Sequence, residues 1–182
     1  IDGQDIKDYS QEAFRKSIGL VLQEPFLYHG TIASNIRMYH EELTDEEVRQ
    51  AAAFVDVADF IESLPGGYDH PVTERGSTLS TGQRQLLAFA RTIAAQPKIL
   101  ILDEATANID QETEEMIQNS LKKMRQGRTT IAIAHRLSTI QDADCIYVLD
   151  KGKIIESGNH DQLIALGGMY KKMYDLQAGM MK

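Results

Sequence analysis

The chain has 182 residues, 42% of them apolar, and its 27 acidic and 19 basic residues give a net charge of −8. This length suits one domain, and the apolar fraction is enough for a core and excludes a disordered chain. The acidic balance argues against non-specific nucleic-acid binding, so no nucleic-acid partner is expected. No apolar run approaches the roughly 18 to 20 residues that span a bilayer.

The single cysteine and the first residues bear on the setting of the protein. Cys145 has no second cysteine to pair with, so a reducing compartment is expected. It lies in the apolar run 143–149, which favours a buried small side chain over a reactive thiol. The opening residues, Ile1-Asp2-Gly3-Gln4, lack an initiator methionine and are typical of the middle of a domain. We interpret the sequence as a piece of a longer protein.

The first elements are a short helix, expected at 11–16, and a strand at 18–22. The strand ends at Gln23-Glu24-Pro25, because proline cannot continue a strand ladder. A helix start follows at 31–36, with Thr31 near its cap. Further helices are predicted at 44–55, 57–64 and 80–95. The first of these opens with the capping box Thr44-Asp45-Glu46-Glu47, and the last with Ser80 placed three residues before Gln83.

A short apolar run from Lys98 to Leu102 ends in two carboxylates, Asp103 and Glu104. Its Ile and Leu composition predicts a strand buried on both faces of a parallel sheet. Ligands of open α/β sheets bind at the carboxyl ends of such strands. A plain strand exit into a loop is the alternative, but acids buried there would need a partner. Mg²⁺ held by Asp103 and a water polarised by Glu104 would supply that partner.

The remaining chain continues the alternation of strands and helices. Asp110 is expected to cap a helix that runs to Arg125, and a second buried strand, 129–134, ends at His135. A hairpin is predicted at 144–149 and 154–157, followed by closing helices at 160–166 and 169–176. This alternation predicts the α/β class with a largely parallel sheet.

Three further features could serve phosphate or metal binding. The stretch Leu79-Ser80-Thr81-Gly82-Gln83 places free N–H groups at a helix start, where the dipole favours an anion. An ordinary capping box is the better-favoured interpretation of this feature alone. His135 would emerge at the same sheet edge as Glu104 if their strands are neighbours, although a single histidine is more often structural. The amide oxygen of Gln23 could complete a metal shell or sense a phosphate.

Taken in order, these motifs resemble the nucleotide-binding domain of ATP-binding cassette (ABC) transporters. Gln23 matches the Q-loop, 79–83 the signature motif, 99–104 the Walker B strand with its catalytic glutamate, 107–110 the D-loop, and His135 the switch histidine. The resemblance covers essentially all of the chain. It is closest to the exporter branch, including multidrug exporters, at 23–27, 73–76 and 134–140.

The resemblance implies a P-loop NTPase (RecA-like) fold with a mostly parallel sheet. Residues 1–182 would form one partial ABC ATPase domain, with a helical subdomain inserted at about 31–96 and a RecA-like core in the remainder. ATP and Mg²⁺ are the implied cofactors. Mg²⁺ would be held by Asp103 and Gln23, Glu104 would activate water, and His135 would contact the γ-phosphate.

The resemblance also implies two protein partners. One is a second nucleotide-binding domain, in a homo- or heterodimer, whose ATP would be contacted by Ser80, Thr81, Gly82, Gln83 and Asp110. The other is the transmembrane domain of the same transporter, reached through Gln23 to Phe26 and through Glu74 and Arg75, although a charged solvated loop is the alternative for the last two. The full-length protein would lie at the cytoplasmic face of the plasma membrane, while the fragment itself would be soluble.

The sequence departs from the family pattern in two ways. The phosphate loop Gly-x-x-x-x-Gly-Lys-[Ser/Thr] is absent, and the family carries it upstream of Gln23. The N-terminal β-subdomain and the P-loop strand are therefore expected to be missing, and the fragment alone is expected to be inactive. In addition, Thr81 replaces the usual glycine of the signature, where its Cβ would crowd the γ-phosphate. Heterodimeric members with one weakened site often combine such a change with a retained catalytic glutamate.

Three other functions are weighed against an exporter. A soluble ABC-type ATPase of the translation or repair type shares the signature and Walker B, but the segment 135–140 and the lack of a coiled coil argue against it. A non-catalytic module could donate only its signature motif to a partner. A plain structural α/β domain is disfavoured by the order of the motifs.

Overall fold

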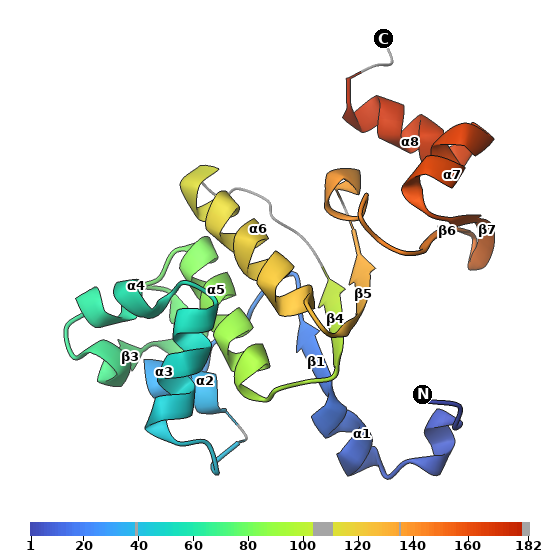
Figure 1. The fold of residues 1–182 in the computed structure, drawn as a ribbon. Coiled ribbons are helices and arrows are strands. Elements are labelled where there is room, and N and C mark those ends of the chain that lie inside the picture. Colours follow the sequence, from blue (N-terminus) through green and yellow to red (C-terminus); the bar gives the residue numbers. More distant parts are fainter. Residues whose placement is uncertain (39, 104–110, 135, 180–182) are drawn as a thin grey trace. The chain divides into compact units, whose positions relative to one another are not determined.

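The computed structural model describes residues 1–38, 40–103, 111–134 and 136–179 (Figure 1). The chain divides into two compact units, Ile1–Ile133 and Ala134–Lys182. No helix in the described ranges combines the length and the apolar character needed to cross a membrane.

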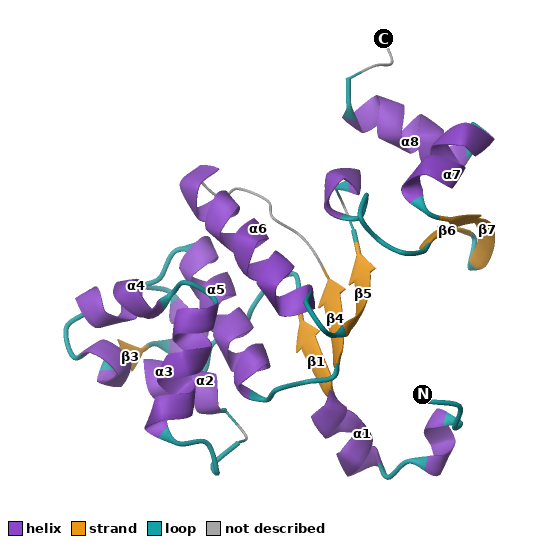
Figure 2. Cartoon of the chain, viewed as in Figure 1, coloured by secondary structure: helices purple, strands orange, loops and turns teal. Residues whose placement is uncertain are grey.

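The first unit is built on a parallel sheet of three strands in the order β1 (Ile18–Val21), β4 (Ile99–Asp103) and β5 (Thr129–Ile133). Ile18 pairs with Ile99 in the first ladder, and Ile99 pairs with Thr129 in the second. The helices between these strands make this an α/β unit with a parallel sheet, as predicted (Figure 2).

The two faces of this sheet differ in burial. Val21, Leu100 and Leu102 are buried in one cluster with apolar side chains of α5 (Thr81–Ala94) and α6 (Gln111–Arg125). On the opposite face Ile99, Ile101 and Asp103 of β4 are only half-buried. Four side chains of the flanking segments are 51–55% exposed there: Leu20, Leu22, Ile131 and Ile133. The prediction that the strand at 99–104 is buried on both faces is therefore wrong, because α5 and α6 pack against one face of it.

The strand at 129–134 was also predicted to be buried, and this is wrong for β5 as well. Four of its five residues are exposed, and only Thr130 is half-buried. β5 lies at the edge of the sheet formed by the described strands and pairs with β4 alone. None of its residues belongs to the apolar cluster of this unit, so no packed layer of the described residues covers its side chains.

The helical part of the first unit packs against α5. It comprises α2 (Ile32–Arg37), α3 (Asp45–Phe54) and α4 (Ala58–Ser63), and a short antiparallel pair, β2 (Gly30–Thr31) with β3 (Pro71–Val72). Leu87 and Phe89 of α5 share one core with fully buried side chains of this part and of the segment before it: Leu27, Ile32, Ile36, Val48 and Ile61. The remaining elements are η1 (Ile6–Asp8), α1 (Gln11–Ser17), η2 (Gly67–Asp69) and η3 (Glu74–Gly76).

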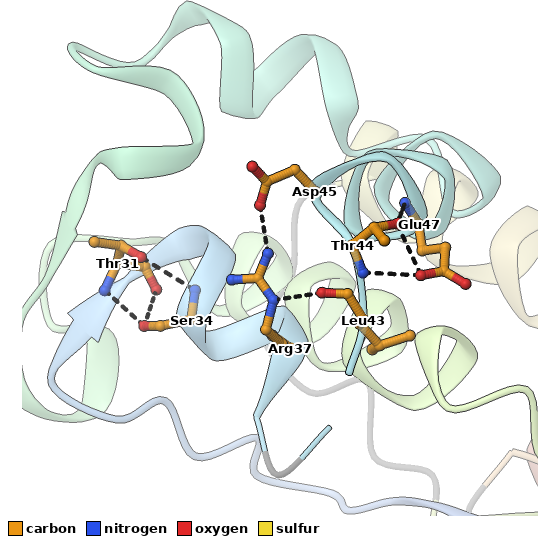
Figure 3. A network of polar contacts seen from close by, with 7 residues as sticks. All are labelled: Thr31, Ser34, Arg37, Leu43, Thr44, Asp45 and Glu47. Carbon is orange, nitrogen blue, oxygen red and sulfur yellow. Dashed lines mark hydrogen bonds and ion pairs between the residues drawn. The ribbon is translucent and has the colours of Figure 1, made fainter. Parts of the chain in front are cut away.

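Helices α2 and α3 each begin with a capping box, and Arg37, the last residue of α2, joins the end of α2 to the start of α3 (Figure 3). At α2 the hydroxyl of Thr31 accepts from the Ser34 N–H, while the Ser34 hydroxyl oxygen accepts from the Thr31 N–H. At α3 the same pattern joins Thr44 and Glu47. Arg37 Nε donates to the Leu43 carbonyl at 2.9 Å. These bonds confirm the helix starts predicted at Thr31 and Thr44.

The second unit pairs a hairpin with two helices. Strands β6 (Ile146–Asp150) and β7 (Lys153–Gly158) are antiparallel, which confirms the predicted hairpin. The unit also contains η4 (Leu137–Thr139), α7 (His160–Leu166) and α8 (Met169–Gln177). Its core is a separate small cluster: Leu137, Ile146, Val148, Leu163 and Tyr170.

Cys145 is exposed, so the prediction that it is buried is wrong. Ile146 and Val148 point into the small core, and Tyr147 between them is exposed. Strand alternation therefore puts Cys145, one residue before Ile146, on the outward side. A hydrogen bond with the Cys145 thiol raises the pKa of Tyr147 above its ordinary value.

Candidate functional site

The carboxyl edge of the parallel sheet carries the residues predicted to bind metal. Val21, near the end of β1, pairs with Leu102, and Asp103, the last residue of β4, pairs with Ile133 at the end of β5. Asp103 is half-buried, and Gln23 follows β1 by two residues and is exposed. The condition that the strands before Glu104 and His135 are neighbours is met, because β4 pairs with β5 in parallel.

Three predicted site residues lie outside the described residues: Glu104, Asp110 and His135. The structure does describe the strands that precede two of them in the sequence. Glu104 follows β4 directly, and His135 comes two residues after the end of β5. In the parts of the chain that are described, no three His, Cys, Asp or Glu side chains gather as a metal site. The two residues predicted to hold Mg²⁺, Asp103 and Gln23, are both described.

Helix α5 begins as the sequence predicts, with Ser80 as its cap. The Ser80 hydroxyl accepts from the Gln83 N–H at 3.2 Å, and Gln83 Oε1 accepts from the Ser80 N–H at 2.9 Å. The Thr81 hydroxyl accepts from Arg84 Nη2 at 3.1 Å, so this side chain is tied to the helix surface. The first turn carries no acid, and Arg84 adds a positive charge, which together with the helix dipole favours an anion.

The segment after Gln23 and the turn at 73–76 lie against each other. The Leu27 carbonyl accepts from the Arg75 N–H at 3.1 Å, and the Leu27 side chain is fully buried. Gly76 has a positive φ of 61°, and an added Cβ there would lie 2.8 Å from Leu27 Cδ1 and 3.3 Å from Arg84 Cδ. The close approach of the Leu27 and Arg84 side chains thus requires glycine at this position.

The residues predicted to face a membrane domain sit on these two adjoining segments. Gln23, Glu24 and Phe26 are exposed on the first, and Glu74 and Arg75 are exposed on the second. The hydrogen bond between the Arg75 N–H and the Leu27 carbonyl joins the two segments, whose surface comprises the exposed side chains of these five residues. Through Gly76 this surface adjoins Arg84, in the first turn of α5.

Comparison with known proteins identifies the family. The model of the ABC transporter family matches residues 1–107. This chain belongs to the ABC transporter family. It is 75% identical over 181 residues to the putative ABC transporter ATP-binding protein exp8 of Streptococcus pneumoniae, covering 100% of this chain and 31% of that protein.

Other ABC relatives agree with this assignment. The probable multidrug resistance ABC transporter ATP-binding/permease protein YheH of Bacillus subtilis is 54% identical over 98% of this chain and 27% of its own length. A solved structure, that of a bacterial Atm1-family ABC exporter with ATP bound, superposes with a TM-score of 0.88 at 45% identity, covering 98% of this chain and 31% of that one. The chain thus spans about a third of the length of these relatives. The predicted resemblance to ABC exporter nucleotide-binding domains is confirmed.

Two polar residues of this ABC cassette were missed by sequence reasoning. Asn35 of α2 is only 2% exposed, and Arg91 of α5 donates three hydrogen bonds to backbone and side-chain oxygens of other elements. The available signal was a polar residue inside a buried stripe, since Asn35 lies between Ile32 and Ile36 on the inward side of α2. A buried amide needs hydrogen-bond partners, and the Asn35 side chain finds them at Tyr28 and Thr31 nearby and at Arg91, 56 positions away.

Proposed function

We propose that this chain is the part of an ABC cassette that activates water and carries the signature motif, in a protein that uses ATP hydrolysis to export substrates across a membrane. The observation that carries the proposal is the register of the parallel sheet, which brings the ends of β1, β4 and β5 to one edge. Family membership supports ATP as the nucleotide. The name of the Bacillus subtilis relative supports a multidrug type of substrate.

The oxygen donors at the sheet edge fit a magnesium ion. Asp103 ends β4 and Gln23 follows the neighbouring strand β1, and their carboxylate and amide offer the hard oxygen ligands that Mg²⁺ prefers. These two residues would hold the ion. When bound, it would neutralise charge that develops on the transferred phosphoryl group.

Hydrolysis requires a water attacking the γ-phosphorus while the bond to the β-phosphate oxygen breaks. Glu104, directly after β4, would orient this water and take its proton. His135 would donate a hydrogen bond to a γ-phosphate oxygen, and ADP would leave with the electrons of the broken bond. The position of both residues after paired strands supports this assignment.

The start of α5 would serve the ATP of a second cassette. Thr81 and Gly82 would present backbone N–H groups to the phosphate. Ser80 and Gln83 would give up one of the two hydrogen bonds of their capping box and form a hydrogen bond to a phosphate oxygen in its place. Asp110 would join the two sites. The uncharged first turn with Arg84 beside it supports binding of an anion here. The two cassettes would form a homo- or heterodimer.

The membrane domain of the same transporter is the second proposed partner. It would contact Gln23 to Phe26 together with Glu74 and Arg75, which would place the full-length protein at the cytoplasmic face of the plasma membrane with this cassette as its soluble part. The exposure of these residues on two hydrogen-bonded segments supports the proposal. The helical part, about 31–96, would act as a subdomain within one cassette.

The direct test is Glu104→Gln in the full-length protein. We expect ATP hydrolysis to fall about a hundredfold or more, because the general base is lost, while ATP binding is retained. Glu115→Gln is the matched control, since Glu115 is an exposed glutamate of α6. An unchanged rate for Glu104→Gln contradicts the proposal. The 182-residue chain alone, which has no phosphate loop, should not hydrolyse ATP.

Thr81 provides a finer test of the signature. Restoring the family glycine by Thr81→Gly removes a Cβ from the phosphate-facing turn and also the bond from Arg84. We expect ATP hydrolysis by the full-length protein to rise if Thr81 weakens the second site. A rate that does not respond would mean that threonine is simply tolerated there.

A further inference from the structure

The segment Phe26–Tyr28 is held by side chains of two helices. Asn35 of α2 binds both backbone groups of Tyr28: its Oδ1 accepts from the Tyr28 N–H at 2.8 Å, and its Nδ2 donates to the Tyr28 carbonyl at 2.8 Å. Nδ2 also donates to the Thr31 carbonyl at 3.0 Å. Arg91 of α5 donates from Nη1 to the Phe26 carbonyl at 2.9 Å. Side-chain hydrogen bonds from Asn35 and Arg91 therefore hold the backbone of this segment.

Asn35 and Arg91 are themselves joined. Arg91 Nε donates to the Asn35 backbone carbonyl at 2.7 Å, and Nη2 donates to Asn35 Oδ1 at 3.0 Å. The guanidinium also lies over the ring of Tyr28, 5.8 Å from its centroid. The planar fork of arginine makes these contacts together, which the point charge of lysine cannot do.

A third contact fixes the middle of the segment. The Leu27 carbonyl accepts from the Arg75 N–H, so the carbonyls of three consecutive residues all have partners from other elements. The side chains of Phe26 and Tyr28 nevertheless remain 41% and 44% exposed. Their rings meet edge to face, with centroids 4.9 Å apart. An exposed aromatic pair on an ordered backbone can dock to a partner at a low cost in conformational entropy.

We propose that Asn35 and Arg91 are positioning residues that fix the Phe26–Tyr28 segment to helix α5, so that the membrane-facing segment and the signature helix move as one body. This rests on the proposed function, in which 23–26 meets the membrane domain and the start of α5 meets ATP. Helix α5 supplies Arg91 from its last turns and the capping box from its first. A displacement of the segment would therefore reach the signature motif through a single helix.

The first test is hydrogen exchange of the full-length protein in lipid nanodiscs. Arg91→Lys keeps the charge and removes the fork, and we expect exchange across 24–30 to quicken about tenfold as these bonds weaken. Asn35→Ala should have at least the same effect on the Tyr28 amide. Arg49→Lys is the matched control, because Arg49 of helix α3 also lies over an aromatic ring, that of Tyr68.

The second test is steady-state ATP hydrolysis by the same variants. We expect Arg91→Lys to lower kcat about tenfold and to leave KM for ATP within about twofold of the wild type, because the nucleotide contacts stay intact. The double variant Asn35→Ala/Arg91→Lys should be no slower than the slower single variant, because the two residues act as one unit. Arg49→Lys should change neither constant.

Three results would overturn the inference. These are unchanged exchange at 24–30 in both single variants, faster exchange with an unchanged kcat, or a loss of protection spread over the whole cassette, which would indicate a merely structural role. Failure of the proposed function looks different. The wild type would then show no hydrolysis that depends on Glu104, while the exchange measurement would still decide whether Asn35 and Arg91 hold the Phe26–Tyr28 segment.

Discussion

Helices α3 and α5 begin with the same pattern of hydrogen bonds and differ in the charge that surrounds it. Thr44 and Glu47 close the capping box of α3, and Ser80 and Gln83 close that of α5. The first turn of α3 contains three acids, Asp45, Glu46 and Glu47, whereas the first turn of α5 contains none.

This difference separates a helix start that only stabilises its helix from one that can also bind a ligand. At α3 the acids neutralise the positive end of the helix dipole and would repel a phosphate. At α5 the dipole is left uncompensated, and Arg84 adds positive charge. A capping box therefore says little about function by itself, and the charge left over in the first turn says more.

The largest expected effect comes from giving α5 the first residue of α3. Thr81 and Asp45 are the first residues of their helices, so Thr81→Asp places an acid at the equivalent position. We expect ATP hydrolysis by the full-length protein to fall tenfold or more, by about 1.4 kcal/mol in transition-state free energy, because the acid repels the phosphate of the partner's ATP.

The reciprocal change at α3 is the control. Asp45→Thr removes an acid and a surface ion pair with Arg37, and it should leave the rate unchanged. Thermal unfolding should show that Thr81→Asp does not destabilise the fold, since an acid suits a helix start. Wild-type hydrolysis by Thr81→Asp would refute the distinction drawn between the two helices.

A smaller effect is expected from removing the cap of each helix. Thr44→Ala and Ser80→Ala each delete the hydroxyl that accepts from an N–H of the first turn, at a cost of about 1 kcal/mol. Hydrogen exchange in the first turn of the altered helix should quicken about fivefold in both variants. Only Ser80→Ala should also lower ATP hydrolysis. If Thr44→Ala slows hydrolysis as much, the start of α3 also belongs to the functional machinery.

Local patterns predicted the elements well and the burial of the sheet poorly. The helix starts at Thr31, Thr44 and Ser80 follow from residues within one turn of each cap, which sequence displays directly. The run Ile99–Leu102 is apolar at every position, so its pattern cannot show which face is covered. Coverage depends on α5 and α6, which pack against one face.

Contacts between segments that are distant in the sequence were not predicted either. Arg91 reaches oxygens 56 and 65 positions away, at Asn35 and Phe26, and no spacing rule relates such positions. The parallel sheet was predictable from the alternation of strands and helices, but the strand order β1-β4-β5 was not, and the sequence left open whether the strands before Glu104 and His135 are neighbours. Sequence thus predicted parallel strands, and the structure was needed to order them and to find what holds the segment after β1.

The smallest expected effect distinguishes the two capping boxes by pH. A carboxylate closes the box of α3, and hydrogen bonds from the Thr44 N–H and hydroxyl hold the pKa of Glu47 below its ordinary value of 4.5. Because the folded pKa is lowered, this stabilisation is complete above 4.5 and is lost as the pH falls through the lowered pKa. The neutral amide of Gln83 closes the box of α5 and does not titrate.

Hydrogen exchange in the first turn of α3, corrected for intrinsic rates, should therefore quicken on acidification, while exchange in the first turn of α5 should not. The variant Glu47→Gln should remove the pH dependence at α3. Equal acid sensitivity of the two helix starts would show that the neighbouring acids Asp45 and Glu46, or global unfolding, dominate instead.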